Sequence, residues 1–84
     1  MSRQAMQTDT AELERIEPGR NAFRFYRAAL WPDLFGGVAL MREWGRIGQA
    51  GQLRLEPYDD RQQAEAALDQ LVQQKQRKGY RGAA

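Results

Sequence analysis

Residues 42–52 read REWGRIGQAGQ, and this stretch decides how the rest of the chain can be arranged. Trp44 stands between Arg42 and Arg46 at intervals of two residues. In a β-strand this spacing directs all three side chains to one face of the sheet. An aromatic plane with a cation on either side can stack on a sugar or base, hold phosphates, or pack Arg against Trp inside the protein. Spacing alone favours the internal packing and leaves the other two interpretations open.

A hairpin follows directly from the glycines of this stretch. Gly48 and Gly51 bracket a two-residue turn, which predicts a strand from Val38 to Ile47 and a returning strand from Gln52 to Tyr58. Apolar and polar residues alternate in the returning strand, where the apolar positions are Leu53, Leu55 and Pro57. We therefore expect one face of that strand to be buried and the other to be solvated.

A further strand is predicted upstream, between Asn21 and Trp31. Phe23 and Phe25 alternate onto one face and Tyr26 and Leu30 onto the other, which is typical of a strand inside a sheet. Core packing is the favoured interpretation of these aromatic residues, with a base-stacking platform as the alternative.

The loop at residues 32–37 contains two apolar residues, Leu34 and Phe35, before a Gly-Gly pair. Apolar loop residues usually fold back over the core, and we predict that these two do so. An exposed knob that binds a partner is the alternative.

A C-terminal helix is predicted from about Arg61 to Lys78. Asp59 and Asp60 offer N-caps, and Gln63 can complete a capping box with Asp60. The positions with the spacing of one buried helical stripe are Ala64, Ala67, Leu68, Leu71, Val72 and the stem of Lys75. Gly79 is expected to end the helix in the left-handed conformation.

Basic residues gather at the end of this helix: Lys75, Arg77, Lys78 and Arg81. Cations at a helix C-terminus complement the helix dipole, which is a sufficient structural explanation. Binding of phosphates explains the same cluster equally well, and the two interpretations stay open.

Composition limits the possible functions of this 84-residue, single-domain chain. It contains neither cysteine nor histidine, so disulfides, the usual zinc sites and Cys- or His-based catalysis are not expected. We expect a non-catalytic protein with no metal and no cofactor. No apolar run could span a bilayer and the N-terminus lacks a secretion signal, so we expect a cytoplasmic protein that does not bind membranes.

The N-terminal residues differ from the rest of the chain. Residues 1–20 carry a net charge of −1 and few apolar side chains, and residues 21–84 carry +3. We therefore expect a mostly flexible tail over 1–20 and one domain over 21–84, with Leu13 and Ile16 able to dock on the domain edge. A surplus of +3 is too small to decide on a polyanionic partner, so the placement of the cations has to decide.

The ordered set of motifs resembles the WGR domain, the module named after Trp-Gly-Arg and found in DNA-dependent poly(ADP-ribose) polymerases and in bacterial proteins. The matching residues are Asn21, Phe25-Tyr26, Arg42-x-Trp44-Gly45-Arg46-Ile47-Gly48, Gly51-Gln52, Ala64 and Lys75-x-x-Lys78-Gly79-Tyr80. The resemblance implies an α+β fold, an antiparallel β-sheet with one C-terminal α-helix packed across it. In the polymerases the motif Trp packs on a terminal nucleotide and the motif Arg contacts DNA or neighbouring domains, which implies these roles for Trp44 and Arg46.

Two functions follow as hypotheses. The first is a nucleic-acid-binding module, with DNA ends or single-strand junctions as the expected ligand. Its expected contact residues are Trp44, Arg46, Arg42, Lys75, Arg77, Lys78 and Arg81. The second is a protein-interaction adaptor or regulatory module that uses the same surface or the exposed face of the sheet, because Arg and Trp are also typical of protein hot spots.

Overall fold

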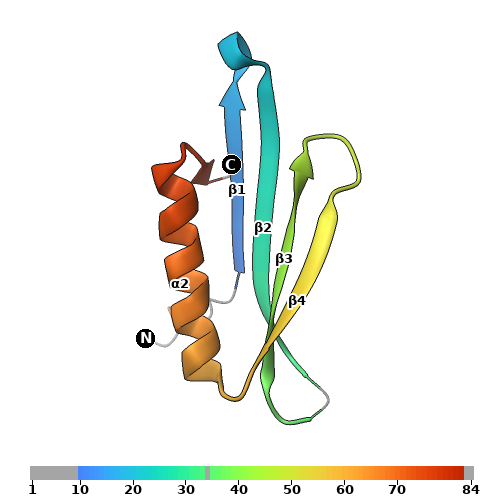
Figure 1. Cartoon of the computed structure of the whole chain (residues 1–84), viewed down its shortest axis with the longest axis vertical. Helices are drawn as coiled ribbons and strands as arrows, with labels where there is room; N and C mark the ends of the chain where they lie inside the picture. The colour runs from blue at the N-terminus through green and yellow to red at the C-terminus, as the bar shows by residue number, and fades with distance from the viewer. Residues whose placement is uncertain (1–9, 34, 83–84) are drawn as a thin grey trace.

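The computed structural model describes residues 10–33 and 35–82, which form an α+β fold (Figure 1). The elements in chain order are β1 (Thr10–Glu17), the 3-10 turn η1 (Pro18–Arg20), β2 (Ala22–Pro32), β3 (Val38–Arg46), β4 (Gln52–Tyr58), α2 (Arg61–Arg77) and β5 (Arg81–Gly82). The strands form one antiparallel sheet in the order β4-β3-β2-β1-β5. The single helix α2 lies across one face of this sheet, as predicted.

The predicted positions of three strands and of the helix are confirmed to within a few residues. β4 has the predicted bounds, β3 ends at Arg46, and α2 ends one residue before the predicted Lys78. The Asp60 carboxylate accepts a hydrogen bond of 2.9 Å from the Gln63 backbone N–H, so Asp60 is the N-cap. Gly79 has a φ of 99°, the left-handed conformation expected after the helix end.

The prediction of a tail is wrong for residues 10–20. β1 pairs with β2 over eight consecutive positions, from Thr10 opposite Ala29 to Glu17 opposite Ala22. Leu13 is buried in the core beneath the helix, although the polar residues beside it give the segment a hydrophilic appearance. The domain therefore starts before residue 21, and residues 1–9 lie outside the described part of the chain.

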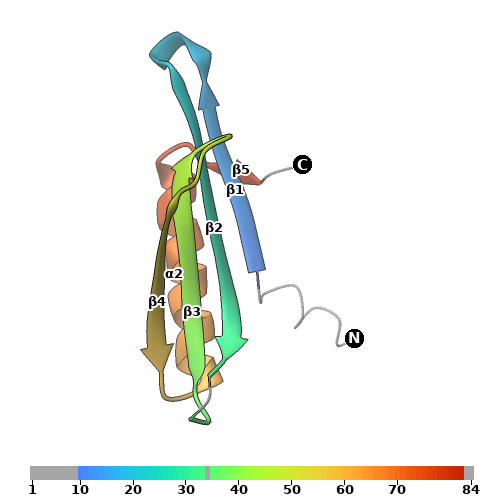
Figure 2. The same ribbon diagram turned by 90° about the vertical axis from the view of Figure 1, so that its right-hand side faces the viewer.

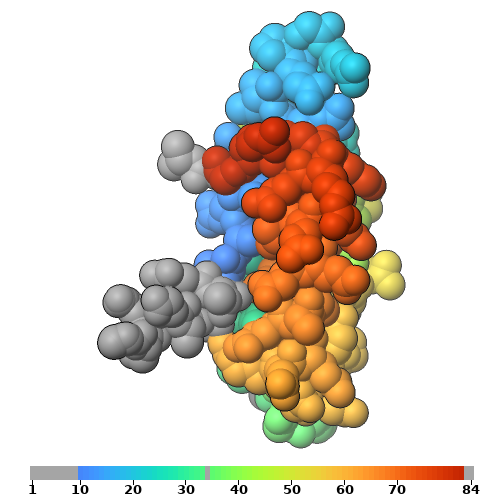
Figure 3. All heavy atoms as spheres, turned by 90° about the vertical axis from the view of Figure 1, so that its left-hand side faces the viewer, coloured from blue at the N-terminus to red at the C-terminus, as the bar shows by residue number. Residues whose placement is uncertain are grey.

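The core lies between α2 and the sheet. The predicted helical stripe faces the sheet, with Ala64, Leu68 and Leu71 buried and Ala67 and Val72 packed against them. These residues meet the side chains of the sheet's helix-covered face: Leu13, Tyr26, Ala28, Leu30 and Leu40. In the space-filling view, η1 and the adjoining ends of β1 and β2 project beyond the C-terminal end of α2 (Figure 3). That end of the sheet face is therefore left uncovered by the helix.

Among the residues that the structure describes, no helix lies on the opposite face of the sheet (Figure 2). Strand alternation places Leu53 and Leu55 on this open face, where their exposed fractions are 63% and 60%. The prediction that the apolar face of β4 is buried is therefore wrong, because α2 packs against the other face. Phe35 is 93% exposed, so the prediction that it folds over the core is also wrong, and Leu34 lies outside the described residues.

Candidate nucleic-acid interface

Trp44 lies on the helix-covered face of the sheet, in the same cross-strand row as Leu13 and Tyr26. It stands opposite Tyr26 in the β2–β3 register, and the two rings stack with centroids 5.9 Å apart and planes 15° apart. Trp44 is half-buried and packs against the core, whereas Tyr26 is fully buried within it. The buried Tyr26 ring thus packs against the Trp44 indole and holds it in place, while Trp44 stays partly accessible.

Arg42 fixes this aromatic pair. Its Nε donates a hydrogen bond of 2.6 Å to the Tyr26 hydroxyl, and its Nη1 donates one of 2.8 Å to Glu56. The guanidinium carbon also lies 5.8 Å from the Trp44 ring centroid, a cation–π distance. The internal packing of Arg against Trp, predicted from spacing, is therefore confirmed for Arg42. Burial raises the pKa of the Tyr26 phenol, so it stays protonated while its oxygen accepts from Arg42.

Three arginines form a row across the sheet next to this pair. Arg15, Arg24 and Arg46 stand directly opposite one another on β1, β2 and β3, one step along the same face from Trp44. Arg15 is paired with Glu17 at 3.2 Å, but within residues 10–33 and 35–82 no carboxylate pairs with Arg24 or Arg46. Like charges directly opposite each other destabilise a sheet. Binding of an anion to this row would offset the destabilising effect of its like charges.

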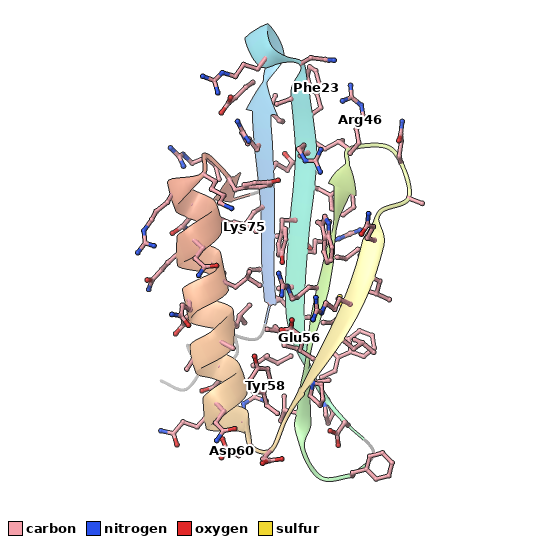
Figure 4. The ribbon with its side chains drawn as sticks, in the orientation of Figure 1. Phe23, Arg46, Glu56, Tyr58, Asp60 and Lys75 are labelled. Carbon is pink, nitrogen blue, oxygen red and sulfur yellow. The ribbon has the colours of Figure 1, made fainter. Side chains whose placement is uncertain are left out.

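Lys75 brings a further cation from the helix. Its ammonium group lies 4.4 Å from the Tyr26 ring centroid, and Figure 4 shows the side chain reaching from α2 towards the sheet. Burial lowers the pKa of Lys75, and the nearby charges of Lys78, Arg42 and Arg24 lower it further. We call the set formed by Arg24, Arg42, Trp44, Arg46 and Lys75 the Trp44 surface.

The two faces of the sheet differ in charge. On the open face, glutamates outnumber arginines among the charged residues of the strands: Glu12, Glu14, Glu43 and Arg27. Glu12, Glu14 and Glu43 line a hollow on this face beside Phe25. An anionic ligand is therefore favoured on the Trp44 surface and disfavoured on the open face.

Comparison with known proteins identifies the family. The WGR domain family matches residues 9–84, nearly the whole chain. The chain belongs to the WGR domain family. The WGR domain is known as a nucleic-acid-binding module.

A curated relative of this WGR domain is the uncharacterized protein y4dW of Sinorhizobium fredii, which is 39% identical over 69 residues. The match covers 82% of this chain and 34% of the relative, so the chain spans about a third of the relative's length. No solved structure matches the chain. In the described part of the WGR domain, no helix has the length and apolar character needed to cross a membrane.

The remaining predicted site residues do not all lie near Trp44. Arg46 lies at the end of β3, where its Nη2 reaches the Asn21 side-chain oxygen at 3.5 Å (Figure 4). Lys78 is exposed near Lys75, but Arg77 is two residues from Lys75 and so points to the opposite side of the helix. Arg81 folds back and donates to the backbone carbonyls of Gln76 and Tyr80. The structure thus places Lys75 beside Tyr26 with Lys78 near it, and directs Arg77 to the opposite side of the helix.

Sequence reasoning missed Arg24, Tyr26 and Glu56 as parts of this interface. Arg24 and Tyr26 alternate on β2 with the same period as Trp44 and Arg46 on β3. This shared period was the available signal. The register that brings the two strands' residues face to face was not, because it depends on loop geometry and on pairing across the sheet.

Gly45 and Gly51 allow the backbones of β3 and the residue before β4 to approach each other closely beside Trp44. A Cβ on Gly45 would lie 2.9 Å from the Gly51 Cα, and a Cβ on Gly51 would overlap the Trp44 carbonyl oxygen. Replacing Gly51 by alanine is expected to displace the β3–β4 hairpin and lower the free energy of unfolding by about 1–3 kcal/mol, the usual cost of overpacking. Urea denaturation measures this cost. Gly19→Ala is the control, because a Cβ on Gly19 meets no atom within 4 Å; an equal loss in both variants would contradict the close approach at Gly51.

Lys75 should make ligand binding depend on pH. A folded-state pKa below the ordinary lysine value means that the charged form is disfavoured in the free domain, and this penalty disappears as the pH rises through the folded pKa. A bound anion would restore the charge, so anion binding is expected to take up a proton at alkaline pH and to weaken as the pH increases. Calorimetric titrations in buffers of different ionisation enthalpy measure this proton uptake. Lys75→Met should abolish it. Unchanged proton uptake in Lys75→Met would contradict the assignment.

Proposed function

We propose that the Trp44 surface binds DNA at strand ends or single-strand junctions. The supporting observation is the pair Arg24 and Arg46, which lie opposite each other without an acidic partner in the described residues, next to a half-exposed indole. Two phosphates, or one terminal phosphate, would neutralise the positive charges of these two side chains. Binding of an anion would therefore offset the unfavourable placement of two like charges opposite each other in the free domain.

An end or junction is proposed because of the single aromatic platform. Inside a duplex both faces of each base are already stacked on neighbouring bases, so one indole has no free base face to occupy. A terminal or unpaired nucleotide offers such a face, and base–aromatic stacking contributes about 1–3 kcal/mol per base. The Tyr26 ring below Trp44 holds the indole in place for this contact.

The arginines of the interface have different proposed roles. Arg24 and Arg46 are exposed and contact phosphates. Arg42 is a positioning residue, because it donates hydrogen bonds to Tyr26 and Glu56 and packs against Trp44 from within the protein. Lys75 and Lys78 add positive potential from the helix, whereas Arg77 and Arg81 are not part of the proposed contact.

Replacing Arg46 by glutamine is expected to weaken DNA binding and to reduce its salt dependence. The logarithm of the association constant falls with the logarithm of salt concentration by about 0.9 for each phosphate contacted, so one lost contact should flatten the slope by about one unit. Fluorescence anisotropy with a labelled 5′-phosphorylated duplex at several salt concentrations measures the slope.

Arg77→Gln is the matched control for that titration, because it removes the same charge from the far side of the helix. We expect it to leave the slope nearly unchanged. Equal slopes for Arg77→Gln and Arg46→Gln would mean that only overall charge matters, and would contradict a localised site.

Covalently closed circular DNA, which has no ends, should compete poorly with the labelled duplex if ends are recognised.

A second function, binding of another protein, is favoured by the open face. Trp31 is 57% exposed there, and the register of β2, β3 and β4 places it on the same apolar area as Met41 and Leu55. Exposed apolar areas of this kind usually mark protein contacts. This area and the Trp44 surface lie on opposite faces, so both contacts can form in one molecule.

A further inference from the structure

β4 is a free edge of the sheet. Its seven residues pair with β3 without interruption from Gln52 to Tyr58, and no other described strand pairs with it. At the opposite side of the sheet, the short strand β5 covers part of β1. Long regular edges with apolar side chains readily pair with another strand, and natural proteins usually block them with bulges, several charges or proline; β4 contains one proline, Pro57, next to its last residue. β4 has no bulge in its register, and Leu53 and Leu55 are both largely exposed.

The backbone groups available on this edge follow from Pro57. Proline has no N–H, so in a regular edge strand its nitrogen is placed on the side that faces away from the neighbouring strand. Residues two apart along a strand direct their N–H and C=O groups to the same side. Leu55 and Leu53 therefore present their backbone N–H and C=O groups on the outer edge of β4.

We propose that β4 pairs antiparallel with β4 of a second copy of this chain, about a two-fold axis at Leu55. In this register Leu55 faces the partner's Leu55, Leu53 faces the partner's Pro57, and Arg54 faces the partner's Glu56. The Arg54 side chain is 65% exposed, and within residues 10–33 and 35–82 its one ion pair is with Glu56 of its own strand, at 3.4 Å. Each Arg54 can thus pair across the axis with a carboxylate of opposite charge.

Neighbouring registers do not share this complementarity. An axis at Arg54 sets two arginines directly opposite each other, and its central residue directs its N–H towards β3. An axis at Pro57 sets two residues without an N–H at the centre of the ladder. An axis at Leu53 leaves less of β4 paired. The strand is therefore self-complementary about Leu55 and not about its neighbours.

The pairing would double the binding surface. A two-fold axis perpendicular to the sheet keeps both helices, and so both Trp44 surfaces, on the same side of one continuous sheet. If the proposed function holds, the dimer can engage two nucleic-acid segments at once, which raises its overall affinity for a ligand that reaches both sites. The β4 pairing itself does not depend on nucleic-acid binding.

The absence of cysteine from the sequence gives a direct test by disulfide formation. In the Leu55→Cys variant, the two introduced thiols would face each other in a hydrogen-bonded antiparallel pair with Cα atoms about 5.5 Å apart, within the range of a disulfide. Leu53→Cys is the matched control on the same strand and face. Its two sulfurs would be displaced by about four residues, or about 13 Å, and could not join.

Under mild oxidation we expect Leu55→Cys to give a covalent dimer at least about ten times faster than Leu53→Cys, because only the first variant brings its thiols within bonding range. Analytical ultracentrifugation should show a concentration-dependent dimer of the wild-type chain that shifts towards monomer in Arg54→Glu, which sets two glutamates against each other. Circular dichroism checks that Arg54→Glu stays folded. Equal cross-linking at both positions, a wild-type chain that is monomeric at every concentration, or an undiminished dimer in Arg54→Glu would each overturn the proposed pairing.

Discussion

Replacing Leu71 by aspartate is expected to lower the free energy of unfolding by several kcal/mol, a large part of the stability of so small a domain. Leu71 is buried between α2 and the sheet, and the core cluster around it consists of apolar side chains and tyrosines. A carboxylate there loses much of its hydration, and the charged groups in the hollow that Leu71 lines, Arg42 and Glu56, already pair with each other at 2.8 Å. A domain of this size has a total stability of roughly 5–10 kcal/mol, so this single loss is a large part of it. Urea denaturation followed by circular dichroism measures the change.

Gln73→Asp provides the control for Leu71→Asp, because residue 73 is exposed on the same helix. It adds the same charge two residues away and should change stability by less than about 0.5 kcal/mol. A cooperative transition at the wild-type urea concentration in Leu71→Asp would show that the helix does not pack on the sheet as described.

Replacing Trp44 by alanine is expected to impair both stability and DNA binding. Removing a fully buried large aromatic residue costs about 3–5 kcal/mol; Trp44 is half-buried, so we expect about 2–3 kcal/mol. Loss of the stacked nucleotide should weaken binding by about 1–3 kcal/mol with little change in salt slope, since no charge is removed. Thermal melting and anisotropy titrations on the same preparation give the two values.

Trp44→Phe separates these two effects. Phenylalanine retains the stack on Tyr26 and most of the packing, so stability should recover largely while affinity recovers only in part, because the smaller ring covers less of a base. Wild-type DNA affinity in a folded Trp44→Ala protein would eliminate the stacking role and leave Trp44 as a structural residue.

Much of the fold could be predicted because local patterns agreed with the final packing. The period of two in β2, β3 and β4 and the buried stripe of α2 are visible in the sequence, and Asp60 and Gly79 mark the helix ends. The docking of Leu13 on the domain edge was predicted, but the full length of β1 was not, because Leu13 stands among charged residues and the strand character of the segment comes from pairing with β2. Pattern also failed at Leu53 and Leu55. Alternation shows which residues share a face and does not show whether another layer covers that face.

The candidate site was predictable only in part, for a related reason. The spacing of Arg42, Trp44 and Arg46 predicted that they share a face, and the β3 register agrees. It could not show that Arg42 is held by Tyr26 and Glu56, or that Arg24 stands opposite Arg46, since both facts depend on which strands are neighbours and in what register.

The two tryptophans offer the most direct test of the central claim, because they report on opposite faces of the sheet. Trp44 belongs to the helix-covered face, and Trp31 is exposed on the open face. The indole N–H signals in a ¹H–¹⁵N correlation spectrum, assigned with Trp44→Phe, can be followed while a 5′-phosphorylated DNA duplex is added. Binding at the Trp44 surface predicts a large shift of the Trp44 signal and little change at Trp31. A shift confined to Trp31, or no shift of either signal at saturating DNA, would contradict the account.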